Sequence, residues 1–106
     1  MTDLDTPPPT RDGLVVRDNP GLRRYELIID DLVVGFADYR LHNGELYIPH
    51  TEVDPNRRDQ GLGAFLVARA LDHIRATRTE AVVPACSFVA MFMTDHPDYA
   101  DLLEPR

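Results

Sequence analysis

The chain has 106 residues, enough for one domain with a modest hydrophobic core. Its 18 acidic and 11 basic residues give a net charge of −7, and the lack of a basic cluster argues against nucleic-acid binding. The apolar runs are too short to span a bilayer, no signal peptide opens the chain, and the single cysteine excludes an internal disulfide. We therefore expect a cytoplasmic protein with no nucleic-acid or membrane partner.

The first residues of the chain are unlike the rest. Residues 1–13 include three consecutive prolines, Pro7 to Pro9, among threonine and aspartate, with almost nothing apolar. Such a composition buries too little apolar surface to offset the conformational entropy that ordering costs. We predict a disordered, proline-rich tail over residues 1–13 and one folded domain over residues 14–106.

Three strands are predicted in the first half of that domain. Residues 24–29 alternate and are rich in β-forming side chains, and the pattern returns at residues 32–41 and 45–53. The turns between them are Asp30-Asp31 and Asn43-Gly44. The second turn is a strong hairpin signal, because both of its residues tolerate positive φ. Together these segments predict an antiparallel three-stranded meander.

The periodicity then changes to that of a helix. Over residues 62–78 apolar side chains recur at intervals of three and four. A short apolar run at residues 81–86 predicts a buried strand, in which Pro84 favours an edge or a bulge. Short helical segments are predicted at residues 88–93 and 99–103. The order is βββ-α-β-α, an α+β fold in which a right-handed crossover places the fourth strand parallel to the third.

The segment between the third strand and the long helix has two glycines beside positive charge. Gly61 and Gly63 lie where the helix begins, and the free N–H groups and partial positive charge of a helix N-terminus bind phosphates. Arg57 and Arg58 precede them. A dinucleotide fingerprint would need glycine where Leu66 stands, and a P-loop would need a lysine, which the chain lacks. The segment is therefore either a cradle for another ligand's pyrophosphate or an ordinary glycine turn.

One family fits this segment. Arg58-Asp59-Gln60-Gly61-Leu62-Gly63 matches Arg/Gln-x-x-Gly-x-Gly/Ala, and so resembles the GNAT superfamily of N-acetyltransferases, in which this loop joins a central strand to a helix and cradles the pyrophosphate of acetyl-CoA. Further similarities are His50-Thr51-Glu52-Val53, Cys86-x-Phe88-Val89 and His96-Pro97-x-Tyr99. The resemblance covers about residues 22–103 and is to a short, single-domain subgroup.

The resemblance implies a minimal GNAT-like domain over residues 14–106, with acetyl-CoA as cosubstrate and no metal. No helical pattern precedes the first predicted strand, so the N-terminal strand–helix pair that usually shapes the acceptor site is absent or reduced. The residues that the resemblance and the loop imply for binding acetyl-CoA are Val53, Arg57, Arg58, Asp59, Gln60, Gly61, Leu62, Gly63, Ala64, Phe88 and Tyr99.

Three residues are candidates for the chemistry. His50 and Glu52 lie two apart on one strand, on the same face as Ile48, and either could take a proton from an acceptor amine or simply bond to backbone or solvent. The resemblance also implies that the third and fourth strands diverge to leave a cleft for the pantetheine arm, with Cys86 at the end of the fourth strand facing it. There it could accept the acetyl group, donate a proton to the departing CoA thiolate, or only line the cleft. A zinc-deaminase pattern is matched only superficially, since one histidine and one cysteine do not complete a zinc site.

The predicted function is acyl-CoA-dependent transfer of an acetyl group to an amine, either directly or through or assisted by Cys86. The acidic surface favours a cationic acceptor, which could be a small amine or a basic protein segment. One alternative is a GNAT-like module that binds CoA or a partner without turnover. Another is a structural domain with no CoA site. We expect a monomer or a weak homodimer.

Overall fold

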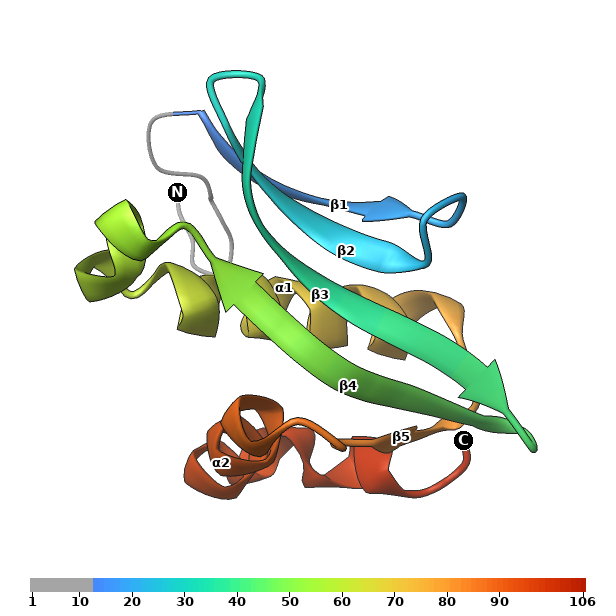
Figure 1. Cartoon of the computed structure of the whole chain (residues 1–106). Helices are drawn as coiled ribbons and strands as arrows, with labels where there is room; N and C mark the ends of the chain where they lie inside the picture. The colour runs from blue at the N-terminus through green and yellow to red at the C-terminus, as the bar shows by residue number, and fades with distance from the viewer. Residues whose placement is uncertain (1–12) are drawn as a thin grey trace.

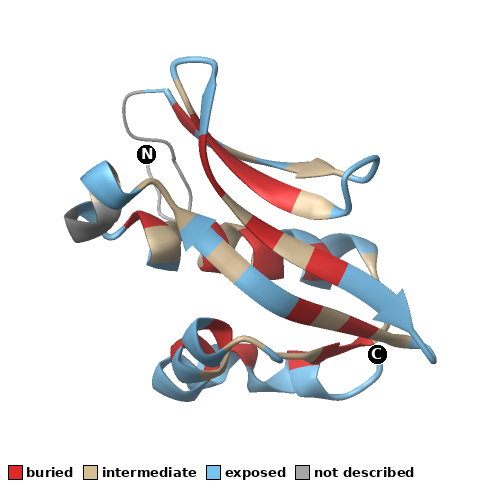
Figure 2. Cartoon of the chain, in the orientation of Figure 1, coloured by how far each residue is buried: buried red, intermediate tan, exposed pale blue. Residues whose placement is uncertain are grey.

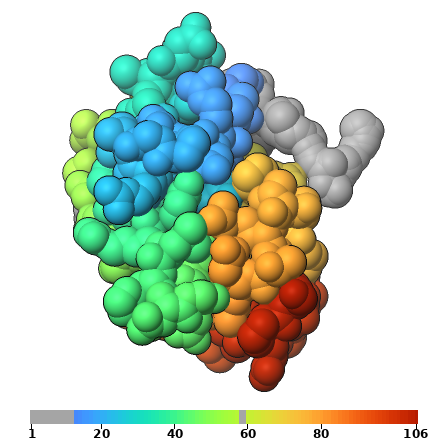
Figure 3. All heavy atoms as spheres, turned by 90° about the vertical axis from the view of Figure 1, so that its right-hand side faces the viewer, coloured from blue at the N-terminus to red at the C-terminus, as the bar shows by residue number. Residues whose placement is uncertain are grey.

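The computed structural model describes residues 13–106, except for the side chains of Arg58 and Asp59. Residues 1–12, which make up nearly all of the predicted tail, lie outside this part. A five-stranded sheet forms one layer, and helix α1 (Leu62–Thr77) packs across one of its faces (Figures 1 and 3). Helix α2 (Ser87–Asp95) and the 3₁₀-helix η2 (Pro97–Leu103) follow the last strand. No described helix is long and apolar enough to cross a membrane.

Four consecutive strands form an antiparallel meander, and a fifth extends it. The strands, in their order across the sheet, are β1 (Leu14–Asn19), β2 (Arg24–Ile29), β3 (Leu32–His42), β4 (Glu45–Val53) and β5 (Ala81–Val83). The three predicted strands are confirmed, with β3 one residue longer than expected. The predicted turn at Asn43-Gly44 is confirmed too, since these two residues have positive φ values of 52° and 78°.

The strand β1 is the element that the sequence did not predict. It pairs antiparallel with β2, so the meander has four strands rather than three. Leu14 is buried and Val16 packs against the core, whereas Val15 between them is exposed. This alternation continues for only six residues beside the proline-rich segment, which is why its signal was weak.

The strand β5 pairs parallel with β4, as the crossover rule predicts. The prediction that it continues to residue 86 is wrong, because β5 ends at Val83. Pro84, which follows, has no N–H to donate to a ladder. Cys86 consequently lies outside the strand and is the residue that precedes the first turn of α2.

A β-bulge interrupts β4. Asp38 pairs with His50, but Arg40 pairs with Tyr47, so two residues of β4, Ile48 and Pro49, lie opposite one residue of β3. The extra residue reverses the alternation beyond it. Ile48 is therefore buried while His50 is exposed, and the expectation that Ile48 shares a face with His50 and Glu52 is wrong.

The core lies between the sheet and α1, as the red segments of Figure 2 show. The predicted apolar stripe of the helix is confirmed, although the helix ends at Thr77 rather than residue 78. Its buried members are Leu62, Leu66, Val67, Ala70, Leu71 and Ile74. Because this stripe fixes the rotation of α1 on the sheet, it also fixes the direction in which the helix N-terminus points.

Candidate active site

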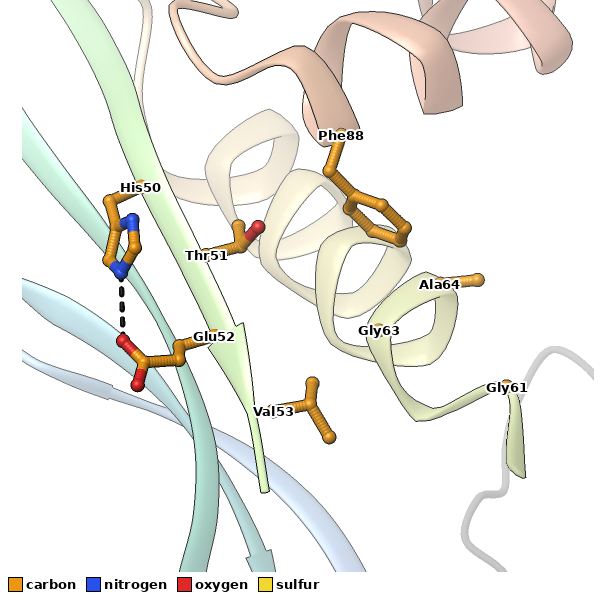
Figure 4. A pocket seen from close by; sticks show the side chains of 8 residues that line it. All are labelled: His50, Thr51, Glu52, Val53, Gly61, Gly63, Ala64 and Phe88. Carbon is orange, nitrogen blue, oxygen red and sulfur yellow. Dashed lines mark hydrogen bonds and ion pairs between the residues drawn. The ribbon is translucent and has the colours of Figure 1, made fainter. Parts of the chain in front are cut away.

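A cleft opens where β4 and β5 separate. Their ladder ends at Tyr47 and Val83, and one further hydrogen bond links the Cys86 N–H to the Ile48 carbonyl at 3.0 Å. Beyond it β4 runs on to Val53 without a strand partner on that side. The cleft has a volume of about 570 Å³ and is lined by His50, Thr51, Glu52, Val53, Gly61, Gly63, Ala64 and Phe88 (Figure 4).

The N-terminus of α1 forms one end of this cleft. Gly61 separates the 3₁₀-helix η1 (Pro55–Gln60) from α1, and its φ of 71° lies in the left-handed region that favours glycine. No described side chain caps α1, and its first internal hydrogen bond runs from the Phe65 N–H to the Gly61 carbonyl. The N–H groups before Phe65 thus have no acceptor within the helix, and those of Gly63 and Ala64 belong to residues that line the cleft.

Gly63, the second glycine of the motif, is required for a different structural reason. Gly63 lies inside α1 with ordinary helical backbone, but a Cβ at this position would lie 3.0 Å from Cζ of Phe88. The Phe88 ring extends from the first turn of α2 over the start of α1 and remains 43% exposed. Gly63 therefore makes room for the aromatic side chain that closes one wall of the cleft.

The other loop residues predicted to bind acetyl-CoA differ in where their side chains lie relative to the cleft. Arg57 pairs with Asp54 through an Nε–Oδ2 distance of 3.8 Å, so part of its charge is already compensated. Gln60 is exposed and Leu62 is buried in the core, and neither side chain lines the cleft. Their N–H groups are what they could contribute to a ligand. The side chains of Arg58 and Asp59 are outside the described part of the chain.

His50 and Glu52 form a close pair on the open face of the sheet. Nε2 of His50 lies 2.8 Å from Oε1 of Glu52, and the two side chains are 55% and 56% exposed. The hydrogen bond to Glu52 raises the pKa of His50, although partial desolvation opposes it. Both side chains point away from α1, whereas Thr51 and Val53 point from β4 toward it (Figure 4). The pair can therefore hold a proton beside the cleft.

Cys86 does not itself line the cleft, but its side chain contacts a residue that does. Oγ1 of Thr51 is 3.4 Å from its Sγ, and Thr51 itself lines the cleft. Burial raises the pKa of the Cys86 thiol, but the Thr51 hydroxyl and the backbone N–H groups of Val89, Phe88 and Thr51 outweigh burial and lower it. The N–H groups of α2 act here through their dipoles, since the cysteine side chain makes no capping hydrogen bond.

The fold places one predicted residue away from the cleft and one residue that was not predicted in its lining. Tyr99 is 8% exposed, and its hydroxyl donates to Oδ1 of Asp72 on α1 at 2.8 Å, so the structure does not bring it to the cleft. Thr51, in contrast, was not singled out from the sequence, although it lies two residues before Val53 and so shares its face. Among the described residues, no group of three or more His, Cys, Asp or Glu side chains could hold a metal ion.

The fold and the cleft together define the class of protein. A helix N-terminus, whose first N–H groups have no acceptor within the helix, faces the gap between two separating parallel strands, in a mixed α+β domain. The sequence model of the GCN5-related N-acetyl-transferase family matches residues 24–102, from the start of β2 to near the end of η2. The chain belongs to this family, which indicates an acyltransferase-type function. No curated protein matches the chain.

Proposed function

We propose that the protein is an N-acetyltransferase that moves an acetyl group from acetyl-CoA to an amine. Family membership supports transfer of an acyl group in general. The observation that carries the finer proposal is the continuous cleft that runs from the N-terminus of α1 to the point where β4 and β5 separate. A helix N-terminus is suited to a pyrophosphate, and the volume of the cleft, about 570 Å³, falls in the range of small-ligand sites.

The cofactor would lie along the free edge of β4. The pyrophosphate would accept hydrogen bonds from N–H groups between Gln60 and Ala64, while the pantetheine arm passes between Val53 and the Phe88 ring. The amides of pantetheine are donors and acceptors, and the edge of β4 beyond Tyr47 offers backbone groups without a strand partner. Pairing an extended chain with an exposed strand edge is a common mode of recognition.

Transfer requires a neutral amine, because an ammonium group has no lone pair for attack. In direct transfer the amine nitrogen attacks the thioester carbon, the bond from that carbon to the CoA sulfur breaks, and the amine proton passes to the His50–Glu52 pair. The departing CoA thiolate takes a proton from the Cys86 thiol or from solvent. In the covalent route the Cys86 thiolate attacks first, releases CoA, and then gives up its acetyl group to the amine.

Binding of acetyl-CoA can be tested with two matched glycine variants. Gly61 and Gly44 have φ values of 71° and 78°, and an added Cβ would have no heavy atom within 4 Å at either. Glutamate therefore introduces similar backbone strain and the same charge at both positions, but only Gly61 lies at the cleft. By calorimetry we expect the wild type and Gly44→Glu to bind acetyl-CoA and Gly61→Glu to lose binding. Absence of binding by the wild type, or equal binding by both variants, would refute the proposal.

A binding module without turnover is the second candidate. It is favoured by the openness of the face that carries His50 and Glu52, since no helix precedes β2 among the described residues to enclose an acceptor. Release of CoA in the presence of a panel of amines, small and cationic or displayed on basic peptides, separates the two candidates. Mass spectrometry after incubation with acetyl-CoA alone tests for acetylated Cys86. Full turnover by Cys86→Ala would exclude the covalent route.

A further inference from the structure

Thr51 lies between the cleft and Cys86, which carries the only thiol of the chain. It follows the bulge at Ile48 and Pro49, which turns its side chain toward α1 while the side chain of His50 turns away. Its hydroxyl lies between the cleft, which it lines, and the Cys86 sulfur at 3.4 Å. Cys86 itself belongs to another element, at the start of α2, so this contact spans the gap between the separating strands.

The hydroxyl has no other side-chain partner in the described part of the chain. Nearby on the same face of β4 are Ile48, which is buried, and Val53, which packs against the core. Valine has the shape of threonine and would pack equally well among such neighbours, so packing alone does not explain a hydroxyl here. Either the hydroxyl or the thiol could donate in the contact with Cys86, and sulfur accepts a hydrogen bond far better as a thiolate than as a thiol.

Among the side chains that the structure describes, the charged groups nearest the sulfur lie on β4. On β4 these are His50, whose pKa responds to Cys86, and Glu52, which binds His50. The α1 wall of the cleft consists of Gly63 and Ala64, which carry no charge, and α2 presents only backbone N–H groups to the sulfur. Thr51 is therefore the side-chain donor best placed to stabilise negative charge on Cys86.

We propose that Thr51 is a positioning residue, whose hydroxyl donates a hydrogen bond to Cys86 and favours the thiolate form of its sulfur next to the cleft. The importance of this for catalysis rests on the proposed acetyltransferase function. The effect on the thiol does not, because it follows from the contact alone and can be measured in the protein without any ligand.

The single cysteine makes the test direct, because alkylation by iodoacetamide reports on Cys86 and on nothing else. The alkylation rate is measured against pH for the wild type, Thr51→Val, which removes the hydroxyl, and Thr51→Ser, which keeps it. We expect Thr51→Val to raise the pKa of the thiol, which lowers the thiolate fraction and so the alkylation rate near neutral pH by up to about tenfold. Thr51→Ser should stay close to the wild type.

Thr94→Val is the matched control. The Thr94 hydroxyl bonds to the Ala90 carbonyl on the outer side of α2, so its loss should change the thiol pKa in neither direction. An unchanged pKa in Thr51→Val, or an equal rise in Thr51→Ser, would overturn the proposal. Should Thr51→Val fail to fold by circular dichroism, Thr51→Ala removes the hydroxyl in its place, and an unchanged thiol pKa in that variant refutes the proposal.

The functional consequence has its own measurement. If transfer proceeds through acetylated Cys86, Thr51→Val should lower kcat and leave the KM for acetyl-CoA nearly unchanged, because the hydroxyl acts on the sulfur rather than on the bound cofactor. If the protein does not bind acetyl-CoA at all, the alkylation profile still decides the role of Thr51. The two proposals can therefore fail separately.

Discussion

Gly63 and Phe88 are expected to be energetically coupled. In the wild type, Gly63→Ala replaces glycine by the better helix former. In a helix interior this raises the free energy of unfolding by up to about 1 kcal/mol, and in a first turn by less. The new Cβ would lie 3.0 Å from Cζ of Phe88, so the ring must move. Crowding of this kind costs about 1–3 kcal/mol, and a half-exposed ring should place the cost near the lower end. The two effects should nearly cancel, or leave a small loss of stability.

The result should differ once the ring is absent. In a Phe88→Ala background the Gly63→Ala substitution meets no ring, so only the helix gain remains and the variant should become more stable. The interaction free energy of the pair should therefore be about 1 kcal/mol or more, within the range usual for contacting residues. Phe88→Ala by itself also loses some buried surface, but this cost appears in both arms of the cycle and cancels.

Urea unfolding of the four proteins, followed by circular dichroism, measures this interaction free energy. Gly21→Ala in the same two backgrounds is the control, because the nearest atom to its added Cβ belongs to Asn19, far from α2 along the chain. A coupling for Gly63 within about 0.3 kcal/mol of zero would show that the two sites are independent. The reading of Gly63 as space for the ring would then be wrong.

Three further results are expected. Gly61→Ala should destabilise the protein by about 1–2 kcal/mol in urea unfolding, because alanine must adopt the φ of 71°, and a neutral effect would contradict this. Since the Glu52 carboxylate raises the pKa of His50, Glu52→Gln should shift the NMR titration of His50 to lower pH; a shift to higher pH would reverse the assigned sign. Tyr99→Phe should cost about 1 kcal/mol through its lost bond to Asp72 and leave acetyl-CoA affinity unchanged, whereas weaker binding would restore the cofactor role predicted from the sequence.

Elements with long, regular patterns were predictable. The β-forming runs of β2 and β4 and the apolar stripe of α1 are long enough to predict each element, and in α1 also its buried face, whereas the bulge in β4 reversed the face expected for His50 and Glu52 relative to Ile48. The glycine loop was predictable because its chemistry depends on adjacent residues and on the backbone of a helix start. In contrast, β1 has few alternating positions and is stabilised by its pairing with β2, a contact that the pattern of β1 alone does not contain.

The parts of the site that depend on contacts between distant segments were not predictable. The approach of Thr51 to Cys86 joins residues 35 positions apart, and it requires both the bulge in β4 and the early end of β5. Tyr99 shows the converse case. Its position near the end of a family-like motif predicted a place at the cofactor, but packing of η2 against α1 directs its hydroxyl to Asp72 instead.

The bulge at Ile48 and Pro49 also determines which side chains the cleft can contain. It adds one backbone residue without a partner in β3, and every position from His50 to Val53 depends on that count. If the same residues alternated regularly from Ile48 with no bulge, His50 and Glu52 would turn toward α1 and Thr51 and Val53 toward the open face. The side chains that the cleft contains are thus determined by the extra residue at the bulge as well as by the residue types of the strand.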